Sequence, residues 1–256
     1  MALKYTFFMA LMGRIFIGCS GFSYDHWRGI FYPEDLPKTE WLGFYSSQFN
    51  AVEINSTFYH LPKKTTTKKW ADNCPSGFLY VVKMWRQITH YKRLKEAQEP
   101  IKVFISRVEA LIPKIAAVLV QLPPGLHKEL DLLKSFLRQL PSGIKFAFEF
   151  RHKSWYEDDT YRVLEEAGAH FVIHDYQGKV SPKKVIGDLA YIRFHGPEGN
   201  YRGSYGDAVL ADWARFINDN ACHGKTCLAF FNNDFEAMAP ANAKTLLKLI
   251  ETSVKG

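Results

Sequence analysis

The sequence has few cysteines, and their arrangement excludes two common stabilising devices. They are scattered along the 256 residues, at Cys19, Cys74, Cys222 and Cys227. No two of them form a CxxC pair, and no histidine lies at the spacing of a zinc ligand. We therefore expect neither the disulfide framework of a small secreted scaffold nor a structural zinc site. This cysteine usage predicts a cytoplasmic protein.

The sequence also lacks an apolar segment that could span a membrane. The longest candidate, residues 5–12, is soon interrupted by Arg14. A transmembrane helix needs about 20 apolar residues, and the residues after Arg14 are typical of a buried strand rather than a cleavage site. We expect residues 1–13 to be an extension ahead of the fold and not a secretion signal, and we expect no membrane partner.

Two further absences concern the organisation of the chain. No linker rich in glycine, proline or serine divides it, and no GxGxxG or Walker loop follows a strand candidate. A hydrophobic fraction of 47% and a charged fraction of 23% exclude a disordered or fibrous protein. We therefore expect residues 14–256 to form one domain, and an open dinucleotide-binding sheet is the less favoured alternative.

What the chain does contain is a regular alternation of short apolar segments and longer helical patterns. The predicted strands are 14–19, 51–55, 78–83, 117–122, 145–150, 170–174, 190–195 and 227–232. The predicted helices are 39–49, 100–114, 128–140, 156–167, 207–220 and 241–251. Such alternation favours parallel strands joined by helical crossovers. Eight strands in a chain of about 250 residues predict an α/β fold of the (β/α)8 TIM-barrel type.

In such barrels the active site lies at the carboxyl ends of the strands, so polar residues there are the first candidates. The segment 145–151 (KFAFEFR) shows the pattern most clearly. Because side chains alternate along a strand, its three phenylalanines share the face beneath the helices, and Glu149 and Arg151 share the inner face. A buried glutamate and arginine need partners or a ligand, since burying either alone is costly.

The same alternation places polar side chains at the inner ends of other strands. These are Glu53, Asn55, Lys83, Gln121, Arg193, His195 and Asn232, with either His174 or Asp175 on the sixth strand, whose face is ambiguous. The excess of cations suits a phosphate or carboxylate, which the two arginines would bind in bidentate fashion. Catalysis would fall to Glu149 and Glu53 as acid and base, with His195 and Lys83 as acid or polarising groups. The alternative is a structural ion-pair network.

Aromatic residues also follow several strand ends, at Phe58-Tyr59-His60, Trp85-Arg86 and Trp155. They could stack on a sugar or base, or else pack loops over the rim of the barrel. The predicted ligand-binding residues are Arg151, Arg193, Asn55, Gln121, His174, Asn232, Tyr59 and Trp155. The glycine-rich segment 196–203 is interpreted as a phosphate loop or mobile lid, or equally as an ordinary turn.

A series of motifs runs in order from about residue 14 to residue 250. They are Ile17-Gly-Cys-Ser-Gly21 with Trp27, Phe31-Tyr-Pro33, Glu53-Ile-Asn-Ser-Thr-Phe-Tyr59, Val82-Lys83 before Ile88-Thr-His90, Gln121-Leu-Pro-Pro124, Glu149-Phe-Arg-His-Lys-Ser-Trp155, Arg193-Phe-His-Gly196, Asn232-Asn-Asp234 and Asn242-Ala243. This set resembles the family called domain of unknown function 72, the YecE-like proteins, although Cys19 stands where threonine is more usual. The resemblance implies a TIM-type barrel and does not imply a reaction.

The leading functional prediction is an enzyme that acts on an anionic small molecule, either phosphorylated or nucleotide-like. The net charge of +7 permits such a partner. One alternative is a nucleic-acid-binding protein without catalysis, which would use Lys63, Lys64, Lys68 and Lys69. That basic segment is otherwise interpreted as a solvated loop. A non-catalytic scaffold is a third hypothesis.

Two better-known classes of barrel enzyme can be compared with the strand ends. A metal-dependent isomerase or endonuclease IV-like enzyme remains an alternative, because acidic and histidine residues at the strand ends could supply part of a divalent-metal site. No cofactor is required by the sequence. A common barrel glycosidase is not supported, because its two carboxylates would end the fourth and seventh strands, where Gln121 and His195 stand.

Overall fold

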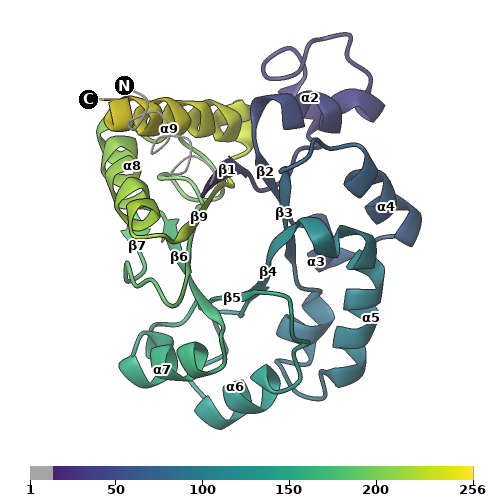
Figure 1. The fold of residues 1–256 in the computed structure, drawn as a ribbon, viewed down its shortest axis with the longest axis vertical. Coiled ribbons are helices and arrows are strands. Elements are labelled where there is room, and N and C mark those ends of the chain that lie inside the picture. Colours follow the sequence, from purple (N-terminus) through teal and green to yellow (C-terminus); the bar gives the residue numbers. More distant parts are fainter. Residues whose placement is uncertain (1–13, 256) are drawn as a thin grey trace. The chain divides into compact units, whose positions relative to one another are not determined.

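The computed structural model describes residues 14–255 and is shown in Figure 1. The predicted extension 1–13 lies outside this range. The strands are β1 (Ile15–Cys19), β2 (Ala51–Ile54), β3 (Leu79–Lys83), β4 (Ile115–Gln121), β5 (Phe146–Glu149), β6 (His170–Tyr176), β7 (Lys179–Val180), β8 (Leu189–Phe194) and β9 (Thr226–Phe231). The helices are α2 (Trp41–Gln48), α3 (Ser56–Tyr59), α4 (Lys64–Asp72), α5 (Gln98–Val108), α6 (Leu130–Leu137), α7 (Asp158–Glu166), α8 (Asp207–Cys222) and α9 (Met238–Lys255).

The strands follow one another in sheet order as they do in sequence, and the first pairs with the last. The order is β1-β9-β8-β6-β5-β4-β3-β2, with β7 added at β6. The pairs β1–β9, β3–β4, β4–β5, β5–β6 and β8–β9 are all parallel. Parallel strands joined in this order by helical connections define the (β/α)8 class. The eight predicted strands are all present.

The chain divides into two compact units. Unit 1 comprises the residues up to Val52 and those from Ile173 onward, and unit 2 comprises Glu53–Val172.

In unit 1, aromatic side chains hold the helices on the outer face of the strands. Phe194 of β8 stacks on Phe231 of β9 with ring centroids 4.4 Å apart. Trp213 of α8 meets Phe194 edge-on at 5.3 Å. Helices α8 and α9 pack against each other, as Figure 1 shows. Such ring pairs bury large apolar areas in preferred geometries, so they fix the outward face of β8 and β9.

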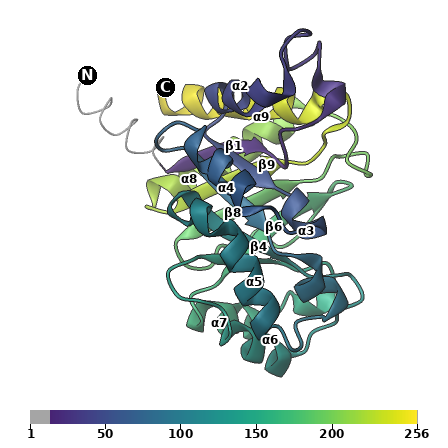
Figure 2. The ribbon, with the colours of Figure 1, turned by 90° about the vertical axis from the view of Figure 1, so that its right-hand side faces the viewer.

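In unit 2, the predicted alternation of β5 is confirmed. Phe148 points outward and meets Phe136 of α6 edge-on, and Phe150 stacks on Trp155 at 4.7 Å. The register pairs Gln121 of β4 with Glu149 of β5, so both lie on the opposite face from Phe148. Helices α4 and α5 lie side by side, as seen in Figure 2.

Two predictions about unit 2 were wrong. The basic segment 63–69 is not a loop: Lys63 directly precedes α4, and residues 64–69 form its first part. Its threonines are poor helix formers, yet the buried Thr67 hydroxyl bonds to the carbonyls of Lys64 and Arg107, and this tertiary contact overrides propensity. The predicted helix 100–114 is α-helical only to Val108 and continues as a 3₁₀-helix, because Pro113 cannot supply an α-helical N–H.

The short strand β7 was not predicted. It forms an antiparallel hairpin with the end of β6, so that β6 runs to Tyr176 rather than ending at His174. The two-residue turn, Gln177 and Gly178, has φ values of 55° and 68°. Positive φ at both positions is the requirement of a tight type I′ hairpin, for which asparagine, rather than glutamine, usually precedes glycine.

Candidate functional site

In unit 2, five polar side chains form what we call the Glu149 cluster: Lys83, His90, Gln121, Glu149 and Arg151. Glu149 ends β5 and is fully buried. Its Oε1 accepts a 2.8 Å hydrogen bond from Gln121 Nε2 and lies against Arg151 Nε. The predicted juxtaposition of these three side chains is therefore present. A cation and an amide donor on one oxygen stabilise the ionised carboxylate by charge-assisted hydrogen bonding.

Lys83 ends β3 and is 8% exposed. Its ammonium group lies 4.2 Å from the ring centroid of Phe58, a distance typical of a cation–π contact. The hydroxyl of Thr57 donates to the backbone carbonyl of Lys83 at 2.7 Å, and Thr57 lies on α3 directly after β2. The end of β3 is thus tied to the segment that carries Phe58.

His90 was not among the predicted site residues. It lies on a π-helical turn, Gln87–Tyr91, in the loop after β3. Its ring meets Phe58 edge-on at 4.8 Å, and its Nδ1 lies 2.9 Å from the hydroxyl of Thr89. Burial, followed by the charges of Lys83 and Arg151, lowers the pKa of His90 from 6.5 to about 4. The imidazole is therefore neutral at physiological pH.

In unit 1, Arg193, His195 and Asn232 form what we call the His195 cluster. Arg193 Nη1 lies 3.3 Å from His195 Nε2, and Asn232 Nδ2 lies 3.2 Å from His195 Nδ1. A guanidinium can only donate, so His195 Nε2 accepts from Arg193. The Asn232 amide contacts the other ring nitrogen, Nδ1.

Aromatic rings surround His195, which is only 1% exposed. The rings of His174, Tyr176 and Tyr201 lie at 6.2, 6.2 and 6.1 Å from it. His174 therefore faces the His195 cluster. Asp175 instead hydrogen-bonds to Tyr205, which packs on the outer residue Phe194, and burial raises the pKa of this carboxyl. The ambiguous face of the sixth strand is thus resolved in favour of His174.

The glycine-rich segment after β8 forms a closed turn with a bridge between Gly199 and Arg202. The N–H of Gly196 donates to the hydroxyl of Tyr205. Asn242 Oδ1 accepts from the backbone N–H of Tyr205 at 3.1 Å and from Asn233 Nδ2 at 2.9 Å. These buried bonds tie both ends of the turn to α9. Asn200 and Tyr201 both have positive φ, which directs the Tyr201 ring toward His195.

The remaining predicted residues fall in different environments. Glu53 is fully buried at the end of β2, Asn55 is partly buried just before α3, and Tyr59 is 52% exposed. Trp155 is buried, with its Nε1 donating to the carbonyl of Leu126 and its ring on Phe150. The structure therefore gives Trp155 the packing role that was the alternative to ligand contact.

On α4, Lys64 pairs with Glu109 at 3.4 Å and Lys68 with Asp72 at 3.0 Å, which reduces the charge available to a nucleic acid. Within residues 14–255, no group of three or more histidine, cysteine, aspartate or glutamate side chains is placed to hold a metal ion. In the same range no helix is both long and apolar enough to cross a membrane.

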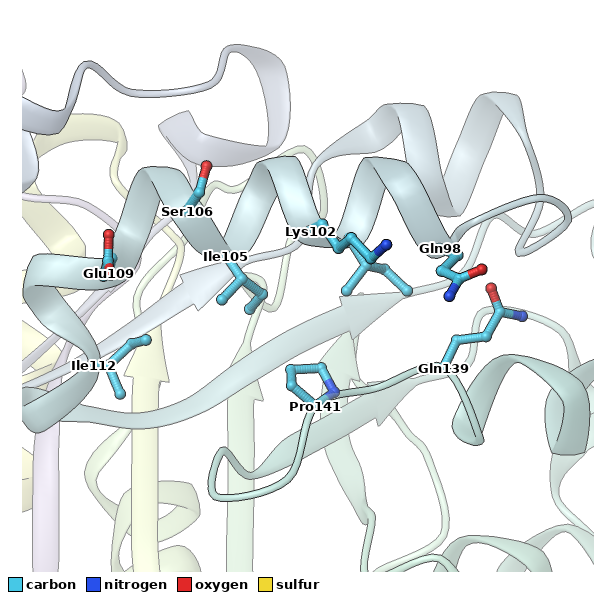
Figure 3. A pocket seen from close by; sticks show the side chains of 9 residues that line it. Gln98, Lys102, Ile105, Ser106, Glu109, Ile112, Gln139 and Pro141 are labelled. Atoms are coloured by element: carbon cyan, nitrogen blue, oxygen red, sulfur yellow. The ribbon is translucent and has the colours of Figure 1, made fainter.

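A cavity of about 470 Å³ lies on the outside of unit 2 (Figure 3). Ile101, Ile105 and Ile112 supply its apolar lining on the side of α5 and the 3₁₀-helix. Pro141 and Gln139 face them from the segment before β5, as Figure 3 shows. None of the candidate site residues lines this cavity.

Fold and site together define a (β/α)8 protein with polar clusters at the carboxyl ends of its strands. A family model described as "Protein of unknown function DUF72" matches residues 16–256, and the chain belongs to this family. It is 27% identical to the UPF0759 protein YunF of Bacillus subtilis (strain 168), over 94% of this chain and 96% of that protein. It is 30% identical to the UPF0759 protein YecE of Escherichia coli (strain K12), over 63% and 59%.

Solved structures of the same family agree with this assignment. A DUF72 family protein from Thermotoga maritima MSB8 superposes with a TM-score of 0.78 at 27% identity, covering 93% of this chain and 99% of that one. One from Enterococcus faecalis V583 gives a TM-score of 0.75 at 21% identity, covering 92% and 97%. The predicted resemblance and the predicted TIM-type fold are confirmed. Family membership assigns no substrate.

Proposed function

We propose that the protein is an enzyme that binds an anionic substrate, phosphorylated or nucleotide-like, and acts on it by acid–base chemistry at the carboxyl ends of its strands. In unit 2, Lys83 and Arg151 bind the anion and Glu149 is the general base. This assignment follows the class of the fold, in which active sites lie at the carboxyl ends of the strands.

The observation that carries the proposal is the environment of His90. Burial, followed by the charges of Lys83 and Arg151, makes this position unfavourable for a third positive charge and lowers the pKa of His90 to about 4. Burial disfavours a charge of either sign, but the contribution of the two cations favours an anion. The cluster therefore attracts phosphate or carboxylate groups, and an anion bound there reduces the repulsion between the cations.

Glu149 supports the second half of the proposal. The hydrogen bond from Gln121 and the adjacent Arg151 cation favour the carboxylate form of this buried group, which is the form a general base requires. Glu53 is proposed as its partner carboxylate, and Asn55 as a ligand contact. Gln121 is a positioning residue, since it orients the Glu149 carboxylate.

The His195 cluster of unit 1 is a separate part of the proposal. Arg193 is proposed to bind an anionic group, and His195, held by Arg193 and Asn232, to exchange a proton. His174 is proposed as a ligand contact. Within residues 14–255 no two cysteines are joined by a disulfide bond, and three of the four are buried, which supports the proposed cytoplasmic location.

The test of the Glu149 cluster compares two lysines by titration calorimetry with phosphorylated compounds. Lys83→Met is expected to weaken binding of an anionic ligand at least tenfold, because it removes one charge from the cluster. Lys102→Met is the matched control, because Lys102 is exposed on α5 and pairs with Glu99. Equal affinities for the wild type and Lys83→Met would contradict the proposed anion site.

The test of the base uses the ligand found in that titration. Glu149→Gln preserves the hydrogen bond from Gln121 and removes the proton-accepting group. Turnover, followed by NMR of the ligand, should fall at least 100-fold, within the range typical of losing a general base. The variant should still fold, with a lower melting temperature than the wild type because Arg151 loses its buried carboxylate partner. Unchanged turnover would remove Glu149 from this role.

A further inference from the structure

Next to the Glu149 cluster, two exposed tyrosines flank an arginine. Tyr59 of α3 is 52% exposed and Tyr91 of the π-helical turn is 62% exposed. The guanidinium carbon of Arg86 lies 5.8 Å from the ring centroid of Tyr59 and 5.3 Å from that of Tyr91. We call Tyr59, Arg86 and Tyr91 the aromatic platform. A cation held between two aromatic rings presents a flat, polarisable surface to a further ring.

The platform is continuous with the Glu149 cluster through Phe58. The ring of Tyr59 meets that of Phe58 edge-on, with centroids 5.0 Å apart. Phe58 in turn lies 4.2 Å from Lys83 Nζ and 4.8 Å from the ring of His90. The Lys83 ammonium and the Tyr59 ring are therefore within about 9 Å of each other. A single small molecule could contact both.

The backbone around the platform adopts rare conformations that are typical of ligand-binding segments. The turn Gln87–Tyr91 is a π-helix, a rare form that occurs frequently at functional sites. Arg93, Leu94 and Glu96 follow it with φ values of 48°, 70° and 46°. Non-glycine residues held in this region are costly, and such strain clusters at ligand clamps and active sites. Contacts such as Arg93 Nη2 to the carbonyl of Gly125, at 2.6 Å, hold the segment in place.

We propose that the aromatic platform binds the base of a mononucleotide whose phosphate lies at Lys83 and Arg151. This inference rests on the anionic substrate of the proposed function and narrows its class to nucleotides. Base–aromatic stacking tolerates every base because each has a π face, so the platform selects a nucleotide over a simple sugar phosphate without fixing which base. The guanidinium of Arg86 adds a cation–π contact to a conjugated ring, which a sugar lacks.

A mononucleotide fits better than a nucleic-acid strand. A strand would need cations that follow its backbone beyond the cluster. In unit 2 the neighbouring lysines on α4, Lys64 and Lys68, are instead paired with carboxylates. The cations nearest the platform are Lys83 and Arg151. With the Glu149 carboxylate beside Arg151 they leave a single net positive charge, which suits one phosphate group rather than a strand.

The test is titration calorimetry of the full chain with adenosine 5′-monophosphate, ribose 5-phosphate and a single-stranded oligonucleotide. Tyr59→Leu and Tyr91→Leu remove the π face and keep apolar bulk. Tyr59→Phe and Tyr91→Phe keep the ring and serve as matched controls. Both tyrosines are largely exposed, so all four variants should keep the wild-type melting temperature.

The expected result is that the nucleotide binds at least tenfold more tightly than ribose 5-phosphate. Each leucine variant should bind the nucleotide at least fivefold more weakly than the wild type and should bind ribose 5-phosphate equally well. The affinity of each phenylalanine variant for the nucleotide should stay within twofold of the wild type.

Three results would overturn the inference. If the nucleotide and ribose 5-phosphate bind with equal affinity, and Lys83→Met weakens both, the platform does not contribute to binding, whereas the anion site is supported. Binding of neither compound would overturn the anion site and the inference together. Tighter binding of the oligonucleotide, with an affinity that falls steeply as salt rises, would replace the mononucleotide by a nucleic-acid strand.

Discussion

At the scale of single residues, the informative observation is that burial and two cations act in the same direction on His90. Residues such as Glu149, Gln121 and Lys83 could be predicted because strand alternation fixes the side on which they point. His90 could not, because it lies on a π-helical turn that follows no periodic pattern. The one sign of it in the sequence was its place in a motif of the family.

The pH dependence of stability follows from the lowered pKa of His90. Between pH 6.5 and about 4 the unfolded chain binds a proton at this position and the folded chain does not. Stability is therefore lost as pH falls through this window, and His90 contributes no loss above it. Because the ring is only half-buried, solvent reduces the effect to about 1 kcal/mol.

The measurement is urea unfolding at pH 7.5 and pH 5 for the wild type and His90→Gln. Between pH 7.5 and pH 5 the free energy of unfolding should fall by about 1 kcal/mol more in the wild type than in the variant, since the other titrating groups are common to both proteins. An identical loss of unfolding free energy in the two proteins would show that the pKa of His90 is not lowered in the folded state.

At the scale of elements, prediction succeeded where one physical pattern dominated and failed where a tertiary contact or a special backbone conformation decided. The strand β5 alternates so regularly that both of its faces were predicted. Helix α4 was missed because a run of threonines argues against a helix, and only the buried contacts of Thr67 reverse this. The β7 hairpin was missed because its turn, Gln177-Gly178, lacks the usual asparagine.

The role of Thr67 in α4 is tested by an isosteric change. Thr67→Val removes the hydroxyl that bonds to the carbonyls of Lys64 and Arg107, at 3.0 and 2.9 Å. The free energy of unfolding should fall by about 1–2 kcal/mol, because buried hydrogen-bond partners are left unpaired. Thr65→Val, at an exposed position of the same helix, is the control and should cost less than about 0.5 kcal/mol. Equal losses of unfolding free energy in the two variants would show that the Thr67 hydroxyl does not stabilise α4.

The turn after β8 depends on one glycine. Gly196 has a φ of +91°, and a Cβ there would lie 2.3 Å from the carbonyl oxygen of Arg202. Gly196→Ala should therefore destabilise the protein by at least about 2 kcal/mol in urea unfolding. Gly206→Ala is the matched control, since its φ is −71° and its Cβ would meet nothing within 4 Å. A Gly196→Ala protein as stable as the control would contradict the structure of this turn.

At the scale of the whole molecule, the sequence was sufficient for the fold class and for the family, because eight strand–helix repeats and a long series of motifs leave few alternatives. It was also sufficient for the strand-end candidates, of which Gln121, Glu149 and Arg151 meet in unit 2, and Arg193, His195 and Asn232 in unit 1. Tyr59 and Arg86 could also be named as stacking candidates from their places after strand ends. Tyr91 could not, because it lies on the π-helical turn, which follows no strand periodicity.

Binding of an anionic ligand is tested most directly by the melting temperature of EDTA-treated protein. The protein is melted in the presence of phosphate, sugar phosphates, nucleotides, divalent metals or a short oligonucleotide. A ligand at a hundred times its dissociation constant stabilises the folded state by about 2.7 kcal/mol, which is about 5–10 °C for a chain of this size. We expect such a shift with small phosphorylated compounds, largest with nucleotides, and its loss in Lys83→Met. A shift with metals or with the oligonucleotide alone, or no shift with any compound, would contradict the proposed anion site.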